Sequence, residues 1–403
     1  MGHTKSVPEL IIWILFFALI ILPAHALDDW VYYRQITVTN NAAQTLTDYQ
    51  INFTLDAANL IAQGKMRSDC GDIRVTLSDR QTLLPYWIEN LNRTSTCNTN
   101  TTRIWTKVSI PASGSTTILV WYGNPSATSA ENASAVFLFF DHFNTSTGTL
   151  TFLGSCTWVR DTANSTIKVT GGSNDCVAVA NVGTPNVRIL TRAMIGVANS
   201  PFGLSARVQD INNRLYLYSR SDANHLSIAK MVGGSFSEVA YASFAESTNT
   251  WYIFEGLLYG TNLRATVYND ARQQIATVSA TVSDFSTQTQ HGLFSVSNAA
   301  SSFDYLIIAQ YISPEPSVST GEEQKTFTLN DILPHLAAVL FIFLLLIGAL
   351  IIHKNIFILI SMLVIVIFVA RLQITQFVDY MLAVFALIVF AILGFVFYER
   401  WRE

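Results

Sequence analysis

The chain has 403 residues, of which half are hydrophobic and only 13% are charged, with a formal net charge of −4. This length allows two or three domains. The weakly acidic balance, with no basic stripe along the chain, excludes a typical nucleic-acid-binding protein.

Residues 1–26 have the pattern of an export signal. His3 and Lys5 precede an apolar run over residues 10–22, Pro23 interrupts that run, and Ala24 and Ala26 supply the small residues of a cleavage site. We expect cleavage after Ala26, and an uncleaved signal anchor is the alternative. Both interpretations place the middle of the chain outside the cytoplasm.

Apolar and polar residues alternate after the export signal. In residues 49–55 every second residue is apolar, while Gln50, Asn52 and Thr54 occupy the other positions, as in a strand with one buried face. Similar alternation occurs at 35–38, 73–77 and 104–110, and Pro/Gly/Ser/Asn-rich turns separate these segments. Several short strands at this spacing predict an antiparallel β-sandwich over residues 27–132.

Four blocks in this region carry a family resemblance. They are residues 30–38, residues 65–74, LPYWIE at 84–89 and WYGNP at 121–125. In this order and spacing they resemble the surface domain of unknown function numbered 2341, over about residues 28–130. The resemblance implies a β-sandwich module of exported archaeal and bacterial proteins, with no established catalytic residues. The tryptophans could form a packed structural core, whereas Trp87 or Trp121 could bind carbohydrate if its ring is exposed.

A second β-rich region extends over residues 133–312. Candidate strands lie at 215–218, 225–228, 236–239, 251–257, 263–268 and 293–296, and Gly233-Gly234 is a hairpin signal between two of them. The FDHF opening at 140–143, the strand at Trp251 and the closing FDY at 303–305 resemble a concanavalin A-like jelly roll of the laminin-G and lectin type. The fold class is therefore expected to be mainly β, with two antiparallel β-sandwich (jelly-roll-like) domains.

All four cysteines lie between the export signal and the C-terminal apolar block. An even number confined to an exported region indicates an oxidising compartment and two disulfides. Proximity in the sequence favours Cys70–Cys97 and Cys156–Cys176, although four cysteines allow three pairings. A metal site is the rival interpretation, but no Cys-x-x-Cys spacing supports it.

Six glycosylation acceptor triplets support the same compartment. Each has the Asn-x-Ser/Thr pattern, and chance also produces such triplets in a chain rich in these residues. They begin at Asn52, Asn92, Asn100, Asn132, Asn144 and Asn164.

The sequence offers little for catalysis. Glycoside hydrolases with a jelly-roll fold need two carboxylates across a cleft, and residues 137–311 contain no Glu-x-Asp pair of this kind. We therefore expect no enzyme, although distant carboxylates can still meet in a fold. Asp141 is a candidate metal ligand or part of the opening strand. The resemblance makes a calcium ion at the sandwich rim possible, and no other cofactor is implied.

The C-terminal part is expected to anchor the chain in a membrane. Residues 313–331, rich in proline, small and charged residues, predict a short irregular stalk. Apolar runs at 332–352, 356–370 and 381–398 predict three transmembrane helices, followed by a cytoplasmic tail at 399–403. One helix would suffice as an anchor, so three suggest a packing surface for copies of the same chain.

Together these features predict a multi-pass protein of the cell membrane whose residues 27–331 are extracellular and glycosylated. The expected function is non-catalytic binding or adhesion, to glycans or to another surface protein. A carbohydrate-active hydrolase or lyase is one alternative. A self-assembling component of a cell or viral envelope is the other.

Overall fold

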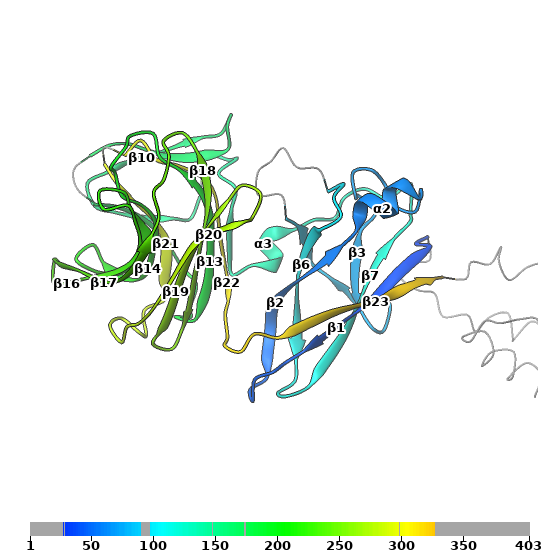
Figure 1. Cartoon of the computed structure of the whole chain (residues 1–403). Helices are drawn as coiled ribbons and strands as arrows, with labels where there is room; N and C mark the ends of the chain where they lie inside the picture. Colours follow the sequence, from blue (N-terminus) through cyan, green and yellow to red (C-terminus); the bar gives the residue numbers. More distant parts are fainter. Residues whose placement is uncertain are drawn as a thin grey trace, which may run out of the picture. The chain divides into compact units, whose positions relative to one another are not determined.

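The computed structural model of the protein describes residues 27, 29–89, 97–146, 148–172, 175–297 and 299–326. The expected export signal, the three expected transmembrane helices and the cytoplasmic tail lie outside these residues. The described part is mainly β, and its antiparallel sheets form sandwiches (Figure 1). No helix in this part has the length and apolar composition needed to cross a bilayer.

The first sandwich pairs a five-stranded sheet with a three-stranded sheet. The strand orders are β23-β1-β7-β3-β4 and β2-β6-β5, and apolar side chains such as Ile36, Phe53 and Val120 fill the space between the sheets. Its elements are β1 (Tyr32–Thr39), β2 (Leu46–Leu55), α2 (Ala57–Ala62), β3 (Arg74–Leu77), β4 (Leu83–Leu84), β5 (Tyr86–Ile88), β6 (Thr102–Ile110), β7 (Ser115–Tyr122) and β23 (Ser317–Lys325). Helix α3 (Ala133–Val136) leads out of it.

The second sandwich has larger sheets, of eight and seven strands. The first runs β10-β11-β22-β13-β18-β19-β20 with β8 beside β22, and the second runs β17-β16-β15-β14-β21-β12-β9. Its strands are β8 (Phe139–Asp141), β9 (Thr151–Leu153), β10 (Thr157–Asp161), β11 (Thr166–Gly171), β12 (Asp175–Asn181), β13 (Val187–Met194), β14 (Phe202–Asp210), β15 (Asn213–Arg220), β16 (His225–Val232), β17 (Ser235–Ser243), β18 (Trp251–Tyr259), β19 (Asn262–Asn269), β20 (Gln274–Thr281), β21 (Gln290–Val296) and β22 (Ser302–Gln310).

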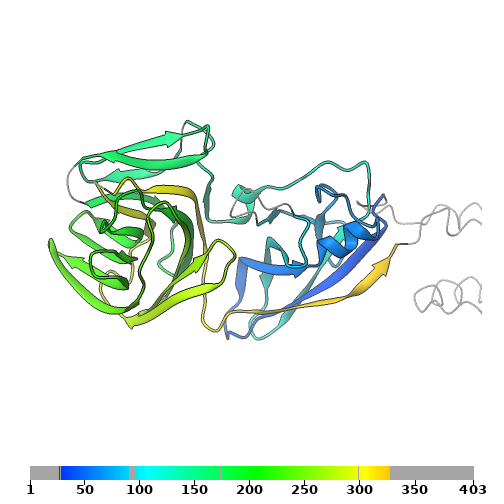
Figure 2. The same ribbon diagram turned by 45° about the horizontal axis from the view of Figure 1, so that its top comes forward.

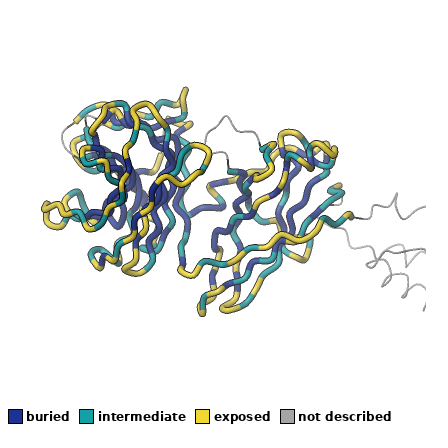
Figure 3. Tube along the Cα trace, in the orientation of Figure 1, coloured by how far each residue is buried: buried dark blue, intermediate teal, exposed yellow. Residues whose placement is uncertain are grey.

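The core of the second sandwich lies between these two sheets. Leu204, Leu217, Ile228, Phe254 and Leu293 are all buried there. The buried strand centres and exposed loops are visible in Figure 3. The candidate strands from the sequence coincide with observed strands because a half-buried strand must place apolar residues at every second position.

Strand β23 corrects the expectation of an irregular stalk. Residues 317–325 pair with β1 in antiparallel register, with Val38 opposite Val318 and Tyr32 opposite Lys325. The returning strand lies along β1 in Figure 2. Most of its side chains are exposed, so it has no apolar alternation that the sequence could reveal. Backbone pairing holds it, and its charges are typical of an edge strand.

The return of β23 makes the second sandwich an insertion within the first. The chain completes β1 to β7, leaves through α3, builds the second sandwich and comes back to β1. Both form one compact unit of the described chain. The first sandwich therefore needs residues from both ends of this unit.

An apolar cluster joins the two sandwiches. Trp87 and Trp105 on the three-stranded sheet and Phe137 after α3 pack with Leu190 and Tyr305 on the eight-stranded sheet. A polar contact also joins the two sandwiches: the Gln310 backbone N–H donates to Gln50 Oε1 at 2.8 Å. Gln50 is buried, so part of the polar face expected to meet water instead meets the second sandwich.

Two disulfides, Cys70–Cys97 and Cys156–Cys176, form as predicted. Each closes a loop, of 27 and 20 residues respectively, and each loop of this length contributes roughly 3 kcal/mol in the chain-entropy model. They support an exported, oxidising environment.

A first prediction concerns the attachment of β23. Glu323 accepts a hydrogen bond from the Tyr122 hydroxyl at 2.9 Å and ion-pairs with Lys65. Glu323→Ala removes the acceptor of the Tyr122 hydroxyl proton and the ion-pair partner of Lys65, while the bond from Arg34 Nε to the hydroxyl remains. We therefore expect the free energy of unfolding of the full chain to fall by about 1–3 kcal/mol in urea titrations. The exposed neighbour Glu322 supplies the control, Glu322→Ala. Equal effects of the two substitutions would contradict the pairing.

His291 on β21 gives a second prediction. Its ring is buried, with Nδ1 accepting from the Arg207 backbone N–H and Nε2 bonded to the Thr184 carbonyl. Burial, aided by the charge of Arg207, lowers the pKa of His291 to about 4. The unfolded chain binds this proton near pH 6.5 and the folded chain only near pH 4. Stability is therefore lost as the pH falls through this window, by about 3 kcal/mol.

The test is the urea midpoint of the full chain measured across this pH window. His291→Gln removes the titrating ring, so the decrease towards pH 4 is expected to be smaller than in the parent. An unchanged pH dependence in the variant would refute the role of His291.

Candidate functional site

Both tryptophans considered for carbohydrate binding are buried. Trp121 is 1% exposed, donates from Nε1 to Thr76 Oγ1 at 2.9 Å and packs on Tyr33. Trp87 is 6% exposed and meets Phe137 edge-on at the junction of the sandwiches. The condition for sugar stacking, an exposed ring, is therefore not met at either position.

Asp141, the candidate metal ligand, is engaged in an ion pair. Its carboxylate contacts the Arg160 guanidinium and accepts the Phe143 backbone N–H at 2.7 Å. In the described ranges, no three His, Cys, Asp or Glu side chains form a group suited to a metal ion. Asp141 thus has a structural role here, fixing β8 against β10.

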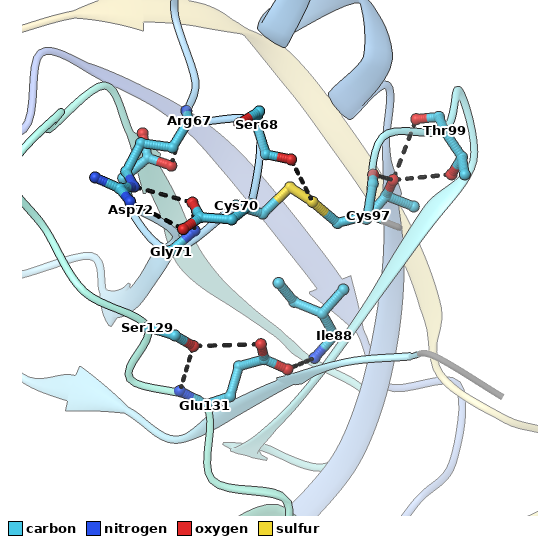
Figure 4. The surroundings of a disulfide bond; sticks show 12 residues. Arg67, Ser68, Cys70, Gly71, Asp72, Ile88, Cys97, Thr99, Ser129 and Glu131 are labelled. Atoms are coloured by element: carbon cyan, nitrogen blue, oxygen red, sulfur yellow. Dashed lines mark hydrogen bonds and ion pairs between the residues drawn. A yellow bond between two sulfur atoms is a disulfide. The ribbon is translucent and has the colours of Figure 1, made fainter. Parts of the chain in front are cut away.

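Residues of two of the blocks behind the family resemblance, among them Arg67, Asp72 and Ile88, lie around the Cys70–Cys97 disulfide (Figure 4). The buried Asp72 carboxylate accepts backbone N–H bonds from Arg67 and Gly123 at 3.2 and 2.8 Å. Arg74 donates to the Thr128 carbonyl at 2.7 Å. The Asp72–Gly123 bond connects the blocks 65–74 and 121–125, and the Arg74 bond connects the first block to the segment that follows the second. These side chains therefore have a structural role in the domain.

The acceptor asparagines differ in accessibility. Asn52 is half-buried and its Oδ1 accepts from Arg103 at 3.4 Å, and Asn92 lies outside the described residues. Asn132 caps α3 through its Oδ1. Among the asparagines of the glycosylation triplets, the exposed ones are Asn100, Asn132, Asn144 and Asn164.

Two carboxylates at the junction bind arginines. Glu89 contacts Arg272 at 2.7 Å and accepts from Trp105 Nε1 at 2.7 Å. Glu255 contacts Arg188 at 2.9 Å and accepts the Tyr268 hydroxyl at 2.8 Å. Burial pushes the pKa of Glu255 upward, but the charge of Arg188 and the Tyr268 hydrogen bond outweigh it and the pKa lies below its usual value. Of these pairs, Glu89–Arg272 joins the two sandwiches, whereas Glu255–Arg188 links neighbouring strands of the eight-stranded sheet.

Exposed aromatic rings occur instead on the edge strands of the seven-stranded sheet. Leu226 and Ile228 of β16 point into the core, so the alternate positions face away from it. We call this outer surface the β16–β17 patch, formed by Arg220, His225, Ser227, Phe236, Glu238 and Tyr241.

A β-bulge assembles the patch. Ala240 lies opposite Ile228 while Glu238 lies opposite Ala229, which leaves Val239 as an extra residue. Strict alternation would put Glu238 and Tyr241 on opposite faces of β17. The extra residue turns both to the same face.

The aromatic part of the patch is flat and open to solvent. The rings of His225 and Tyr241 stack with centroids 3.8 Å apart and planes 8° apart, and Tyr241 is 60% exposed. Phe236, on the same strand as Tyr241, is 44% exposed. Such rings offer an apolar face beside polar groups.

The polar part of the patch lies beside these rings. Glu238 accepts from Ser227 Oγ at 2.6 Å and from Arg220 Nη1 at 3.1 Å. Arg220 also lies over the Phe236 ring at 5.7 Å. Ser227 and Arg220 hold the Glu238 carboxylate from two sides. The carboxylate and the Arg220 guanidinium can then bind hydroxyl groups of a ligand above them.

A buried layer supports the patch from the neighbouring strands. Tyr216 and Tyr218 each meet Phe294 edge-on, and all three are at most 3% exposed. Arg214 ion-pairs with Asp175 and donates to the Tyr216 hydroxyl. This packing fixes the strands, so the patch is preorganised.

Sequence comparison finds one family match. Residues 69–161 match the domain of unknown function DUF2341. The match begins later than the expected start at residue 28 and continues past residue 132 into the second sandwich. No curated protein matches the chain.

Several solved structures are similar to part of the chain, at low identity and low TM-score. A carbohydrate binding module from Bacillus subtilis has 12% identity and a TM-score of 0.31, covering 40% of this chain and 95% of the module. Galectin LEC-6 from Caenorhabditis elegans has 16% identity and a TM-score of 0.25, covering 33% and 89%. A protein of unknown function from Shewanella oneidensis has 15% identity and a TM-score of 0.34, covering 43% and 87%.

A third prediction separates structural from exposed aromatic residues. Trp87→Ala removes a buried ring from the junction, so we expect a loss of about 3–5 kcal/mol in the free energy of unfolding. Tyr241→Ala removes an exposed ring and should change this free energy by less than about 0.5 kcal/mol. Urea unfolding of the two full-length variants gives both values, and a neutral Trp87→Ala would contradict the packed junction.

Proposed function

We propose that this chain is a non-catalytic binding protein displayed outside the cell, and that its β16–β17 patch binds saccharide. One observation carries the proposal: the exposed Tyr241 ring, stacked on His225, lies beside a carboxylate and a guanidinium that are already oriented. The apolar runs at 332–398 complete the proposal as a membrane anchor.

The chemistry of a sugar ring matches this surface. A pyranose presents an apolar C–H face that can lie on the Tyr241 ring, and its edge carries hydroxyl groups. Glu238 accepts hydrogen bonds from such hydroxyls and Arg220 donates to them. Because Ser227 and Arg220 already fix Glu238, binding costs little ordering of side chains.

The charges of the patch favour binding over hydrolysis. Glycoside hydrolysis requires two carboxyl groups with the scissile bond between them. Arg220 contacts both Glu238, at 3.1 Å, and Asp222, at 3.5 Å. Both carboxylates therefore ion-pair with the same guanidinium.

A fourth prediction tests the patch with the full-length protein on a glycan array. The parent is expected to bind a subset of saccharides saturably. Tyr241→Ala and Glu238→Gln should each weaken this binding at least tenfold, about 1.4 kcal/mol. Reducing-sugar release from the bound polysaccharides is expected to stay at background.

Phe152→Ala provides the matched control for Tyr241→Ala. Phe152 is a 46% exposed aromatic residue on β9, at the opposite edge of the same sheet. It should leave binding unchanged. Loss of binding in this control but not in the patch variants, or sugar release by the parent, would refute the proposal.

A further inference from the structure

A groove of about 430 Å³ lies on the other sheet of the second sandwich. Its floor is the outer face of β18, β19 and β20, where Leu257 pairs with Arg264 and Arg264 with Ser279. Tyr311, in the connection from β22 to β23, also lines it. The volume falls in the usual range for small-ligand sites, about 300–1,000 Å³.

The groove depends on the contact between the sandwiches. Tyr259, another lining residue, packs against the apolar core of the first sandwich, as does Ile312 in the connection. On the far side of the connection, Glu315 ion-pairs with Arg188 at 3.0 Å. The wall is therefore held at both ends, and the groove is a fixed feature of the joined unit.

Arg264 is the unusual charge of this groove. The other arginines nearby are neutralised: Arg188 by Glu255 and Glu315, and Arg272 by Glu89. Arg264 is exposed in the groove and has no ion pair or hydrogen bond to any residue that the structure describes. Its five N–H donors are consequently free for a ligand, and their planar fork suits a carboxylate.

The remaining lining offers neutral hydrogen-bonding groups and rings. Asn262 on β19 lies opposite Thr281, and Ser279 on β20 lies opposite Arg264. Tyr259 and Tyr311 supply aromatic faces. Burial, followed by the charge of Glu315, raises the pKa of Tyr311, so its hydroxyl keeps its proton at neutral pH and can donate.

We propose that this groove binds an acidic sugar residue, of the uronic acid class, with its carboxylate on the Arg264 guanidinium. The sugar hydroxyls would meet Asn262 and Ser279, and its apolar face a tyrosine ring. Charge complementarity selects an anionic ligand, and several neutral amide and hydroxyl groups match a polyhydroxylated ring better than an acidic peptide. This site is separate from the β16–β17 patch and lies on a different sheet.

The experiment is calorimetric titration of the full chain with a galacturonic acid trisaccharide and with its carboxyl-reduced counterpart. The acidic trisaccharide should bind, and the reduced one at least tenfold more weakly. Arg264→Gln should weaken binding of the acidic probe at least tenfold, and Arg264→Lys less than that because it keeps the charge but loses the fork. Arg264 is exposed, so these variants should fold as the parent does.

Lys168→Gln is the control with the same change in net charge. Lys168 lies on β11, towards the opposite side of the eight-stranded sheet, and its loss should not alter binding. Tyr241→Ala should also leave the acidic probe bound, which separates this site from the patch. Failure of the parent to bind the acidic trisaccharide, equal binding of both probes, insensitivity to Arg264→Gln, or displacement by a triglutamate peptide at lower concentration would each overturn the proposal.

Discussion

The antiparallel pairing of β1 with β23 is the contact on which the described structure depends. It brings Tyr32 beside Lys325, so the chain must finish the entire second sandwich before the first sheet is complete. Backbone hydrogen bonds supply this closure, and the Tyr122–Glu323–Lys65 contacts fix its register from the side chains. Because the chain is tethered at both ends of the insertion, the second sandwich cannot swing on a single linker.

This double connection explains why the junction contains so many buried groups. Trp87, Trp105 and Phe137 are held against Tyr305 by connections at α3 and at 311–316. Arg188 on β13 lies between Glu255 on the neighbouring strand and Glu315 in the returning connection, so its two ion pairs hold that connection against the eight-stranded sheet. The groove on β18, β19 and β20 depends on this rigid contact, because the returning connection forms its wall.

The two proposed binding surfaces use different devices. On β17, the extra residue Val239 turns Glu238 and Tyr241 to one face and places a charge beside a ring. At the groove, the pairing of β18, β19 and β20 places Arg264 opposite Leu257 and Ser279. Neither of these cross-strand partners is acidic.

Local patterns in the sequence indicated many of the observed strands and the sandwich class, and proximity in the sequence favoured the two observed disulfides among three possible pairings. Alternation at 49–55, the glycine pair at 233–234 and the spacing of Cys70 and Cys97 are local signals, and each depends on neighbouring residues alone. Tertiary structure decided everything that depends on a distant partner. Strand β23 has little apolar pattern because an edge strand buries few side chains, and its pairing with β1 spans nearly 300 residues of chain. Trp87 and Trp121 are suitable residue types for sugar, but packing buries both. Tyr241 and Glu238 share a face only because of a bulge, which alternation along a strand cannot reveal.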